Sequence, residues 1–226
     1  MKKAIVLLSG GLDSTTALYL AKDKGFDEIY AITFLYGQKH NKELEFAKNT
    51  AKKAGVKEHK IVNLMLNQWG DCSLTNDKVD IRDGKIDNEK IPATYVPARN
   101  MVFLSVAASY ADALDITDIF IGVSEVDYSG YIDCREEFIK SMEDTINLGT
   151  ELGVIKKQHI TIHAPFMYMT KTEEIQLGVK LNVDYADTWS CYKGGEKPCG
   201  VCDSCLLRAK AFKEAGLKDP LLAKTN

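Results

Sequence analysis

Near the start of the chain stands the stretch Ala4-Ile5-Val6-Leu7-Leu8-Ser9-Gly10-Gly11-Leu12-Asp13-Ser14-Thr15, which joins an apolar run to a polar loop. The apolar run has the composition of a buried strand, and residues 14–24 have that of a helix. Gly10 and Gly11 can adopt positive φ angles, so the backbone of the loop can approach an anion closely. The first N–H groups of a helix have no partner within the helix and are free to bind such an anion. The stretch therefore predicts a phosphate site.

The polar side chains of this stretch indicate which phosphate compound binds. Ser9, Ser14 and Thr15 supply hydroxyl donors, whereas Asp13 would repel a phosphate unless a cation lay between them. Mg²⁺ accompanies nucleotide phosphates in proteins and binds carboxylates. The plainer alternative is a Gly-Gly turn with a serine or aspartate cap. The coincidence of glycines, hydroxyls and a carboxylate favours a magnesium–nucleotide site.

Two better-known phosphate loops are excluded, because the sequence has neither G-x-x-x-x-G-K-[ST] nor G-x-G-x-x-G after a strand. Residues 9–14, S-G-G-L-D-S, resemble the pyrophosphate loop of the PP-loop ATP pyrophosphatases. That resemblance implies release of pyrophosphate and transfer of AMP to a substrate oxygen. It also assigns ATP binding to a continuous set of residues: Leu8, Ser9, Gly10, Gly11, Leu12, Asp13, Ser14, Thr15, Thr16, Ala17 and Leu18.

The composition is that of an ordinary soluble protein. The chain has 226 residues, 45% of them hydrophobic, a net charge of −3 and a pI of about 5.9. This length predicts a single core with an appendage. The charge lacks the basic excess of proteins that hold long nucleic acids, so we expect no direct nucleic-acid partner. The first apolar run is too short for a signal peptide, and no run reaches the roughly 20 residues of a membrane span. We therefore expect no membrane contact and a cytoplasmic location.

Strands and helices are expected to alternate after the first loop. Strands are predicted at 4–8, 28–35, 60–63, 118–123 and 159–163, and helices at 14–24, about 44–54, 98–114, about 135–148, 171–180 and 203–215. Helical crossovers make such strands pair in parallel, which predicts an α/β fold with a doubly wound, mainly parallel sheet and helices on both faces. The first loop then lies at the carboxyl end of a strand, where such sheets bind ligands.

Two segments depart from this alternation. Residues 64–96 lack periodicity and are long for a connection, which is typical of a lid. The helix at 98–114 is apolar almost all round, which predicts that it is buried, in part against a second copy in a homodimer.

Four of the six cysteines have the spacing C-x₇-C-x₂-C-x₂-C: Cys191, Cys199, Cys202 and Cys205. Four thiolates suit tetrahedral Zn²⁺ and leave no position open for substrate, so we expect one structural zinc per chain. An iron–sulfur cluster is the main alternative, since it also takes cysteine ligands. Reduced thiols fit the cytoplasm. Cys72 stands apart and is interpreted as a small core residue.

A second polar loop, residues 122–135, begins where the fourth strand is expected to end, at the same edge of the sheet. Its acidic residues could accept hydrogen bonds from a guanine-like ring, Tyr128 or Tyr131 could stack on that ring, and Arg135 could bind a carboxylate or phosphate. The alternative is a solvated acidic turn in which Asp133 caps the following helix. Residue chemistry alone favours neither interpretation.

The sequence of this second loop, G-V-S-E-V-D-Y-S-G-Y-I-D-C-R, matches the G-V-x-E-x-D-x-S-G-Y-x-D-C-R segment of the 7-cyano-7-deazaguanine synthases. Further segments are similar to motifs of that family in the same order: residues 36–40 (Y-G-Q-K-H), 96–100 (V-P-A-R-N), Pro165 with Lys171, and 190–192 (S-C-Y) before the cysteines. Ala98 stands where many members carry glycine, a difference that we expect to matter little. The similarity spans nearly the whole chain.

The resemblance implies an ATP-dependent ligase that forms 7-cyano-7-deazaguanine (preQ0), an intermediate towards queuosine, from 7-carboxy-7-deazaguanine and free ammonia. Adenylation would turn the carboxylate into a mixed anhydride that ammonia opens to an amide, and a second activation would dehydrate the amide to the nitrile. Asp13, Lys171 and Arg99 are the catalytic candidates, the last two offsetting charge during AMP transfer. Cys134 is expected to pack or contact substrate rather than act as a nucleophile.

The candidates for binding the deazaguanine substrate are Gln38, His40, Arg99, Asn100, Glu125, Asp127, Tyr131, Asp133 and Arg135. His40 either carries a proton or orients Gln38.

Two other functions are open from the sequence. A PP-loop tRNA-modifying enzyme of the thiolase or lysidine-synthetase type would adenylate a base, although the mild acidity of the chain disfavours it. A zinc-ribbon binding module would use the first loop only to sense nucleotide. For the synthase we expect a PP-loop ATP-binding domain at 1–185. A four-cysteine zinc segment with the C-terminal helix, at 186–226, is expected to pack as part of the same domain.

Overall fold

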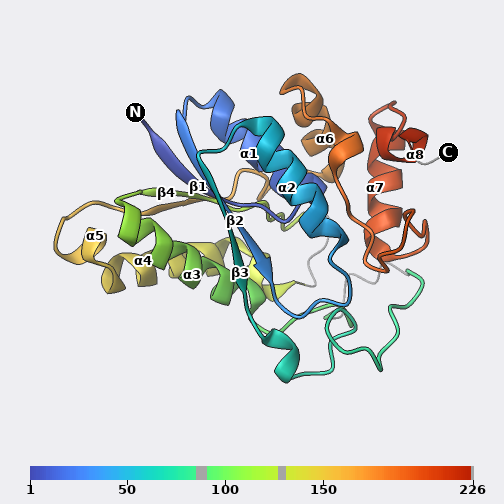
Figure 1. Ribbon diagram of the computed structural model, residues 1–226, viewed down its shortest axis with the longest axis horizontal. Helices are drawn as coiled ribbons and strands as arrows, with labels where there is room; N and C mark the ends of the chain where they lie inside the picture. The colour runs from blue at the N-terminus through green and yellow to red at the C-terminus, as the bar shows by residue number, and fades with distance from the viewer. Residues whose placement is uncertain (85–90, 127–130, 225–226) are drawn as a thin grey trace.

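A five-stranded parallel sheet in the order β3-β2-β1-β4-β5 forms the centre of the molecule, with helices on both faces (Figure 1). This computed structural model describes residues 1–84, 91–126 and 131–224. The strands are β1 (Lys3–Leu7), β2 (Glu28–Leu35), β3 (Glu58–Asn63), β4 (Asp118–Phe120) and β5 (Thr161–His163). The predicted α/β fold with a doubly wound parallel sheet is confirmed.

The helices also follow the predicted order. They are α1 (Leu12–Asp23), α2 (Lys42–Ala54), α3 (Arg99–Leu114), α4 (Glu136–Gly149), α5 (Glu151–Val154), α6 (Lys171–Lys180), α7 (Asp203–Glu214) and α8 (Pro220–Lys224), with 3-10 turns η1 (Leu66–Gln68), η2 (Ile132–Cys134) and η3 (Tyr185–Asp187). The prediction placed α1 two residues too late and missed α5 and α8, which have too few residues to show a helical period. The fourth strand was predicted to reach residue 123 but ends at Phe120.

Both faces of β1 are buried, which explains its continuous apolar run. Ala4 and Val6 lie in the cluster with residues of α1 and α2, whereas Ile5 and Leu7 lie in the larger cluster with residues of α3 and α4. Gly55, in the left-handed conformation at φ 67°, ends α2.

In the single chain, helix α3 is buried on one face, and the cover of its remaining surface by a second copy stays a prediction. Leu104, Ala107 and Ala111 are fully buried. Met101, in the first turn of the helix, is 47% exposed. The sequence pattern is apolar all round, but one layer of strands can cover only one side of a helix.

Within the described part of residues 64–96, several side chains belong to the core rather than to a lid. Leu66, Cys72, Leu74 and Val96 are buried and pack in the same cluster as α3. The interpretation of Cys72 as a core residue is confirmed.

The strand order reverses at β1, since the chain builds β2 and β3 on one side and then returns to β4 on the other. The crevice at the carboxyl ends of β1 and β4 is the place where doubly wound sheets bind ligands. Gly122 follows β4 there, and a Cβ at this position would lie 2.8 Å from the carbonyl carbon of Asp13. Among the described residues, no helix combines the length and apolar character needed to cross a membrane.

Candidate active site

The loop after β1, residues 9–15, is closed by its own side chains and is called the phosphate loop below. The Ser9 and Ser14 hydroxyl oxygens lie 3.0 Å apart, and Ser14 also accepts from the Ser9 N–H at 3.1 Å. Gly10 has φ 87°, and a Cβ there would lie 2.3 Å from the Glu43 carbonyl oxygen, so only glycine fits. Gly11 caps α1 without a side-chain hydrogen bond. The first N–H groups of α1 are therefore available to an anion.

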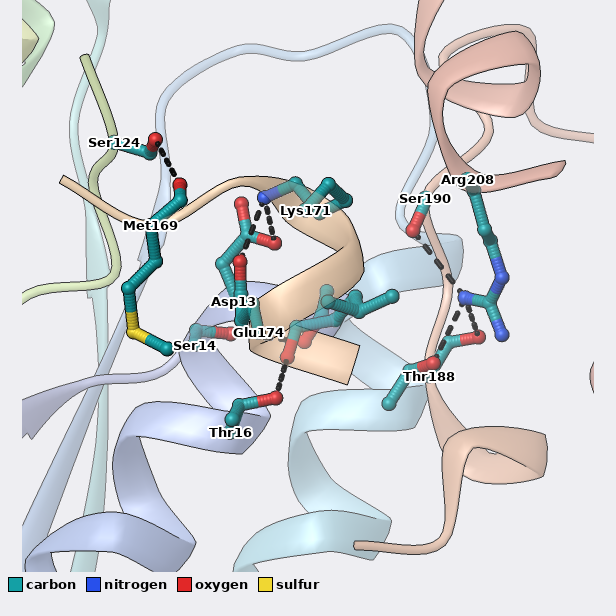
Figure 2. Close-up of polar contacts among 12 residues, drawn as sticks. Asp13, Ser14, Thr16, Ser124, Met169, Lys171, Glu174, Thr188, Ser190 and Arg208 are labelled. Atoms are coloured by element: carbon teal, nitrogen blue, oxygen red, sulfur yellow. Dashed lines mark hydrogen bonds and ion pairs between the residues drawn. The ribbon is translucent and has the colours of Figure 1, made fainter. Parts of the chain in front are cut away.

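Lys171, the first residue of α6, connects two carboxylates beside this loop (Figure 2). Its Nζ donates to Asp13 Oδ1 at 2.7 Å and to Glu174 Oε2 at 2.9 Å. Burial lowers the pKa of Lys171, but the charges of Asp13 and Glu174 outweigh burial and raise it. Burial raises the pKa of Glu174, which is only 1% exposed. The Lys171 ammonium therefore lies between two carboxyl groups, of which that of Asp13 faces the cavity.

A cavity of about 320 Å³ opens in front of the phosphate loop. The predicted site residues that line it are Leu8, Ser9, Gly11, Leu12, Asp13, Ser14, Gln38, His40, Arg99, Asn100, Tyr131 and Lys171. The structure therefore brings the proposed ATP loop, all three catalytic candidates and four other substrate candidates to one cavity.

One group of residues that lines this cavity combines tyrosine rings with two charged side chains. We call it the aromatic wall and define it as Tyr36, Glu43, Arg99, Tyr131 and Tyr192. The Arg99 guanidinium lies 5.7 Å from the Tyr36 ring centre. Burial lowers the pKa of Arg99, but the charges of Tyr36, Tyr131 and Asp133 outweigh it, so the pKa rises and Arg99 stays cationic. Burial raises the pKa of Tyr36 to about 12. The pKa of Tyr192 is raised by the charge of Tyr131, by burial and by a hydrogen bond with Tyr131.

Sequence reasoning missed Tyr36, Glu43 and Tyr192 as individual site residues. Tyr36 and Tyr192 stand inside the quoted motifs Y-G-Q-K-H and S-C-Y, so they could have been found there. Glu43 lies three residues after the first of these motifs and carries no local signal.

Two acidic candidates of the second loop make capping contacts with helices. The Asp133 carboxylate accepts from the Asn100 N–H at 2.9 Å and is 6% exposed, so it caps α3 rather than the following helix. Glu125 accepts from the Glu136 N–H at 3.3 Å, at the start of α4. The alternative of a solvated turn with Asp133 capping the following helix is therefore wrong. Arg135 is exposed and is the N-cap residue of α4. Asp127 and Tyr128 lie outside the described residues.

The later residues of the ATP-binding assignment lie within α1 and point into the protein. Ala17 and Leu18 are fully buried, and the Thr16 hydroxyl lies 2.9 Å from the Tyr185 hydroxyl. The Thr15 side chain is buried as well. These residues hold α1 in place behind the loop.

The candidates after β2 contact backbone groups. Gln38 Oε1 accepts from the Tyr36 N–H at 2.8 Å, and His40 Nε2 lies 3.0 Å from the Tyr192 carbonyl oxygen. Burial lowers the pKa of His40, which favours the neutral ring. His40 therefore donates to this carbonyl and connects the segment after β2 to the cysteine segment.

Cys134 lines the same cavity as a protonated thiol. Burial raises the pKa of Cys134 to about 12, and its Sγ accepts from Asn100 Nδ2 at 3.3 Å. A thiol is a weak nucleophile until it ionises, so this environment does not activate Cys134.

The four clustered cysteines form a candidate metal centre. The Sγ atoms of Cys191, Cys199, Cys202 and Cys205 all lie within 4.8 Å of one another, and those of Cys199 and Cys205 are 3.9 Å apart. Ligands about 2.3 Å from a tetrahedral zinc lie about 3.8 Å from one another. The arrangement therefore fits a metal with four thiolate ligands and no open position.

The cysteine segment is connected directly to the phosphate loop. The Trp189 N–H donates to the Gly10 carbonyl at 2.9 Å, and Trp189 Nε1 donates to the Cys191 carbonyl at 3.0 Å. Buried Arg208 of α7 fastens the same segment, donating to Thr188 Oγ1 at 2.8 Å (Figure 2) and to Asp219 Oδ2 at 2.7 Å.

The fold is shared with solved structures of low sequence identity. A predicted tRNA methyltransferase subunit from Methanocaldococcus jannaschii has a TM-score of 0.51 and 20% identity, over 97% of this chain and 91% of that chain. NMN synthetase from Francisella tularensis has a TM-score of 0.50 and 14% identity, over 99% of this chain and 77% of that chain. At these identities the similarity shows the fold alone. Fold and site together define a doubly wound α/β protein of the PP-loop type with a C-terminal cluster of four cysteines.

Sequence comparison identifies the family. The family model described as "Queuosine biosynthesis protein QueC" matches residues 3–216. The 7-cyano-7-deazaguanine synthase of Clostridium kluyveri is 58% identical over 224 residues, 99% of each chain. That of Thermoplasma acidophilum is 54% identical over 221 residues, 97% of this chain and 91% of the other. The chain belongs to the QueC family of queuosine biosynthesis proteins.

Proposed function

We propose that this chain is an ATP-dependent ligase that converts 7-carboxy-7-deazaguanine and ammonia to 7-cyano-7-deazaguanine through adenylated acid and amide intermediates. The observation that carries the proposal is the single cavity in which the phosphate loop, Lys171 and Arg99 meet. The names of relatives at 58% and 54% identity supply the class of product.

The phosphate loop and its neighbours suit the activation step. The free N–H groups of α1 and the Ser9 and Ser14 hydroxyls would bind pyrophosphate, and Lys171 would offset charge that develops during AMP transfer. Asp13, with its side chain 41% exposed beside the loop, would hold Mg²⁺. Bound there, the ion would neutralise phosphate charge. One carboxylate with substrate phosphates is an ordinary ligand set for this ion, so the residues fit it.

The aromatic wall suits the deazaguanine substrate. Arg99 remains cationic within the cavity and would bind the substrate carboxylate, and Tyr131 would stack on the ring. Gln38, His40 and Asn100 border the same space. Glu125, Asp127, Asp133 and Arg135 remain candidates for binding the substrate.

We further propose that the cysteine cluster holds zinc in a structural role and that the chain works in the cytoplasm, where thiols remain reduced. A homodimer would cover the exposed apolar side chains of α3 and the segment after β3, such as Met101, Met65 and Trp69. Neither a membrane nor a nucleic acid is expected as a partner.

Mass spectrometry of the product tests the reaction. Incubation with 7-carboxy-7-deazaguanine, ATP, Mg²⁺ and ammonium should give the mass of the nitrile, with the amide as a transient species, and pyrophosphate release should require the acid. Asp13→Asn should abolish both products while circular dichroism stays unchanged.

Two results would contradict this function. ATP binding without turnover would favour a nucleotide sensor, and adenylation of tRNA in place of the small acid would favour a tRNA-modifying enzyme. The fold similarity to a predicted tRNA methyltransferase subunit is too remote in sequence to support the second possibility.

A further inference from the structure

Glu43 is a carboxylate in the cavity that the activation step does not use. It lies in the first turn of α2, and its backbone carbonyl packs against Gly10 of the phosphate loop. Its side chain lines the cavity together with Tyr36 and Tyr192. Among the described residues, the Glu43 carboxylate accepts no hydrogen bond and forms no ion pair, whereas Asp13, the other carboxylate that lines the cavity, is paired with Lys171.

The charges around Glu43 leave a negative excess. Arg99 of α3 is the cation that faces it, and the tyrosines that face it are Tyr36 after β2 and Tyr192 of the cysteine segment. Arg99 is also opposed by the buried carboxylate of Asp133. Two carboxylates therefore face one guanidinium, and tyrosine rings beside them can attract a cation through their faces. This end of the cavity suits a small monovalent cation that can donate hydrogen bonds.

The Glu43 carboxylate can gain and lose a proton near neutral pH. Burial raises the pKa of Glu43 to about 7, and the charge of Arg99 limits the rise. An ordinary carboxylate is too weak a base to take a proton from a nitrogen at neutral pH, whereas a group with a pKa near the working pH both accepts and releases protons.

We propose that Glu43 binds ammonium in the cavity and accepts one of its protons, so that ammonia attacks the activated acyl group unprotonated. This inference rests on the proposed function. Ammonium gives a proton to the Glu43 carboxylate, which later passes it to water. The nitrogen lone pair then forms the C–N bond, the C–O bond to AMP breaks, and AMP leaves with that electron pair. The surplus proton on the new amide nitrogen passes to water.

The test compares two nitrogen nucleophiles in the full-length enzyme. Ammonia is almost wholly protonated at neutral pH, whereas hydroxylamine is mostly unprotonated and needs no base before it attacks. Glu43→Gln should lower ammonium-dependent amide formation by about a hundredfold. Hydroxamate formation from hydroxylamine and acid-dependent pyrophosphate release should stay within a few-fold of the wild type, which also shows that the variant is folded.

The pH dependence gives a second readout. Because Glu43 must be ionised to accept the proton, the wild-type amide rate at fixed ammonium concentration should be level above a pH of about 7 and fall below it. Glu43→Gln, which must use the small fraction of free ammonia, should instead lose rate steadily as the pH drops, without a break near 7. The matched control is Glu45→Gln on the same helix, since the Glu45 side chain is 68% exposed and, among the described residues, pairs only with Lys42. It should behave as the wild type with both nucleophiles.

Three outcomes overturn the inference. An equal loss with both nucleophiles would mean that Glu43 binds the deazaguanine ring or maintains the fold, and no loss with either would mean that it takes no part. A wild-type chain that makes neither amide nor nitrile would overturn the proposed function and this inference with it.

Discussion

The phosphate loop and the aromatic wall line one cavity but are built in different ways. Residues 9–15 of the loop are contiguous, and the loop is closed by contacts between Ser9, Gly11 and Ser14. The wall takes its side chains from distant places along the chain, between Tyr36 and Tyr192. The loop therefore depends on backbone conformation, whereas the wall depends on the packing of distant segments. Substitutions in the loop should act on every step of the reaction, and those in the wall should separate one step from another.

Gly10→Ala in the phosphate loop should have the largest effect. The new Cβ would lie 2.3 Å from the Glu43 carbonyl oxygen and 2.6 Å from the Ala47 nitrogen, at φ 87°. We expect pyrophosphate release to become undetectable in an activity assay, and Mg–ATP binding to become undetectable by calorimetry. Gly25→Ala is the control, because Gly25 has φ 80° but open space around its Cβ. It should cost roughly 1–2 kcal/mol of stability and leave ATP binding unchanged. Equal behaviour of the two variants would refute the steric argument.

Lys171→Met beside the loop should lower kcat/KM about 10²- to 10³-fold, since it removes a positive charge aimed at developing phosphate charge. It should also lower the free energy of unfolding by about 3 kcal/mol, because Glu174 would be left buried without its cation. Chemical denaturation and steady-state kinetics measure the two effects.

Lys53→Met is the matched control. Lys53 also pairs with two carboxylates, Asp184 and Asp187, but its side chain is 52% exposed. We expect a change of at most about 1 kcal/mol and unchanged kinetics. A large loss of activity in Lys53→Met, or none in Lys171→Met, would be inconsistent with the role of Lys171.

Removal of metal from the cysteine cluster should disorder the segment that carries Tyr192 of the aromatic wall. It should disturb the phosphate loop more weakly. Elemental analysis should find one zinc per chain, and a chelator should expose the segment around Cys191 to proteases. Since the Trp189 N–H also binds Gly10, the ATP affinity should fall roughly tenfold, the equivalent of about 1.4 kcal/mol. Cys72→Ser, outside the cluster, should keep its metal. Iron in place of zinc, or unchanged proteolysis without metal, would contradict the structural zinc site.

Ala98→Gly, next to Arg99 of the wall, should have the smallest effect and should stabilise the protein. Ala98 has φ 53°, a left-handed conformation that costs an L-residue roughly 1–2 kcal/mol. Glycine would remove this strain, but its unfolded state is more flexible, which offsets part of the gain in stability. We expect a gain of about 0.5–1 kcal/mol in chemical denaturation. Ala113→Gly, within the same helix, should instead cost about 1 kcal/mol. A destabilised Ala98→Gly variant would contradict the argument that the backbone of Ala98 is strained.

Most of the fold and about half of the candidate site follow from local patterns. β2 and α6 were predicted to the residue, because runs of strand-forming and helix-forming residues are local signals. The contacts of the second loop, residues 122–135, were not predicted. Asp133 of this loop caps a helix that begins 34 residues earlier. A carboxylate finds its partner through tertiary packing, and no spacing in the sequence encodes that choice.

Contiguous residues are thus enough to determine the strand–loop–helix unit at the candidate site, the parallel sheet around it and the thiolate cluster. The reason is that backbone conformation and short cysteine spacings depend on neighbours in the chain. Only the tertiary structure unites Arg99, Glu43 and Tyr192 in one cavity, where the Glu43 carboxylate has no hydrogen-bond partner among the described residues. Burial and the sum of nearby charges set the chemistry of such a group, and both arise when distant segments pack together.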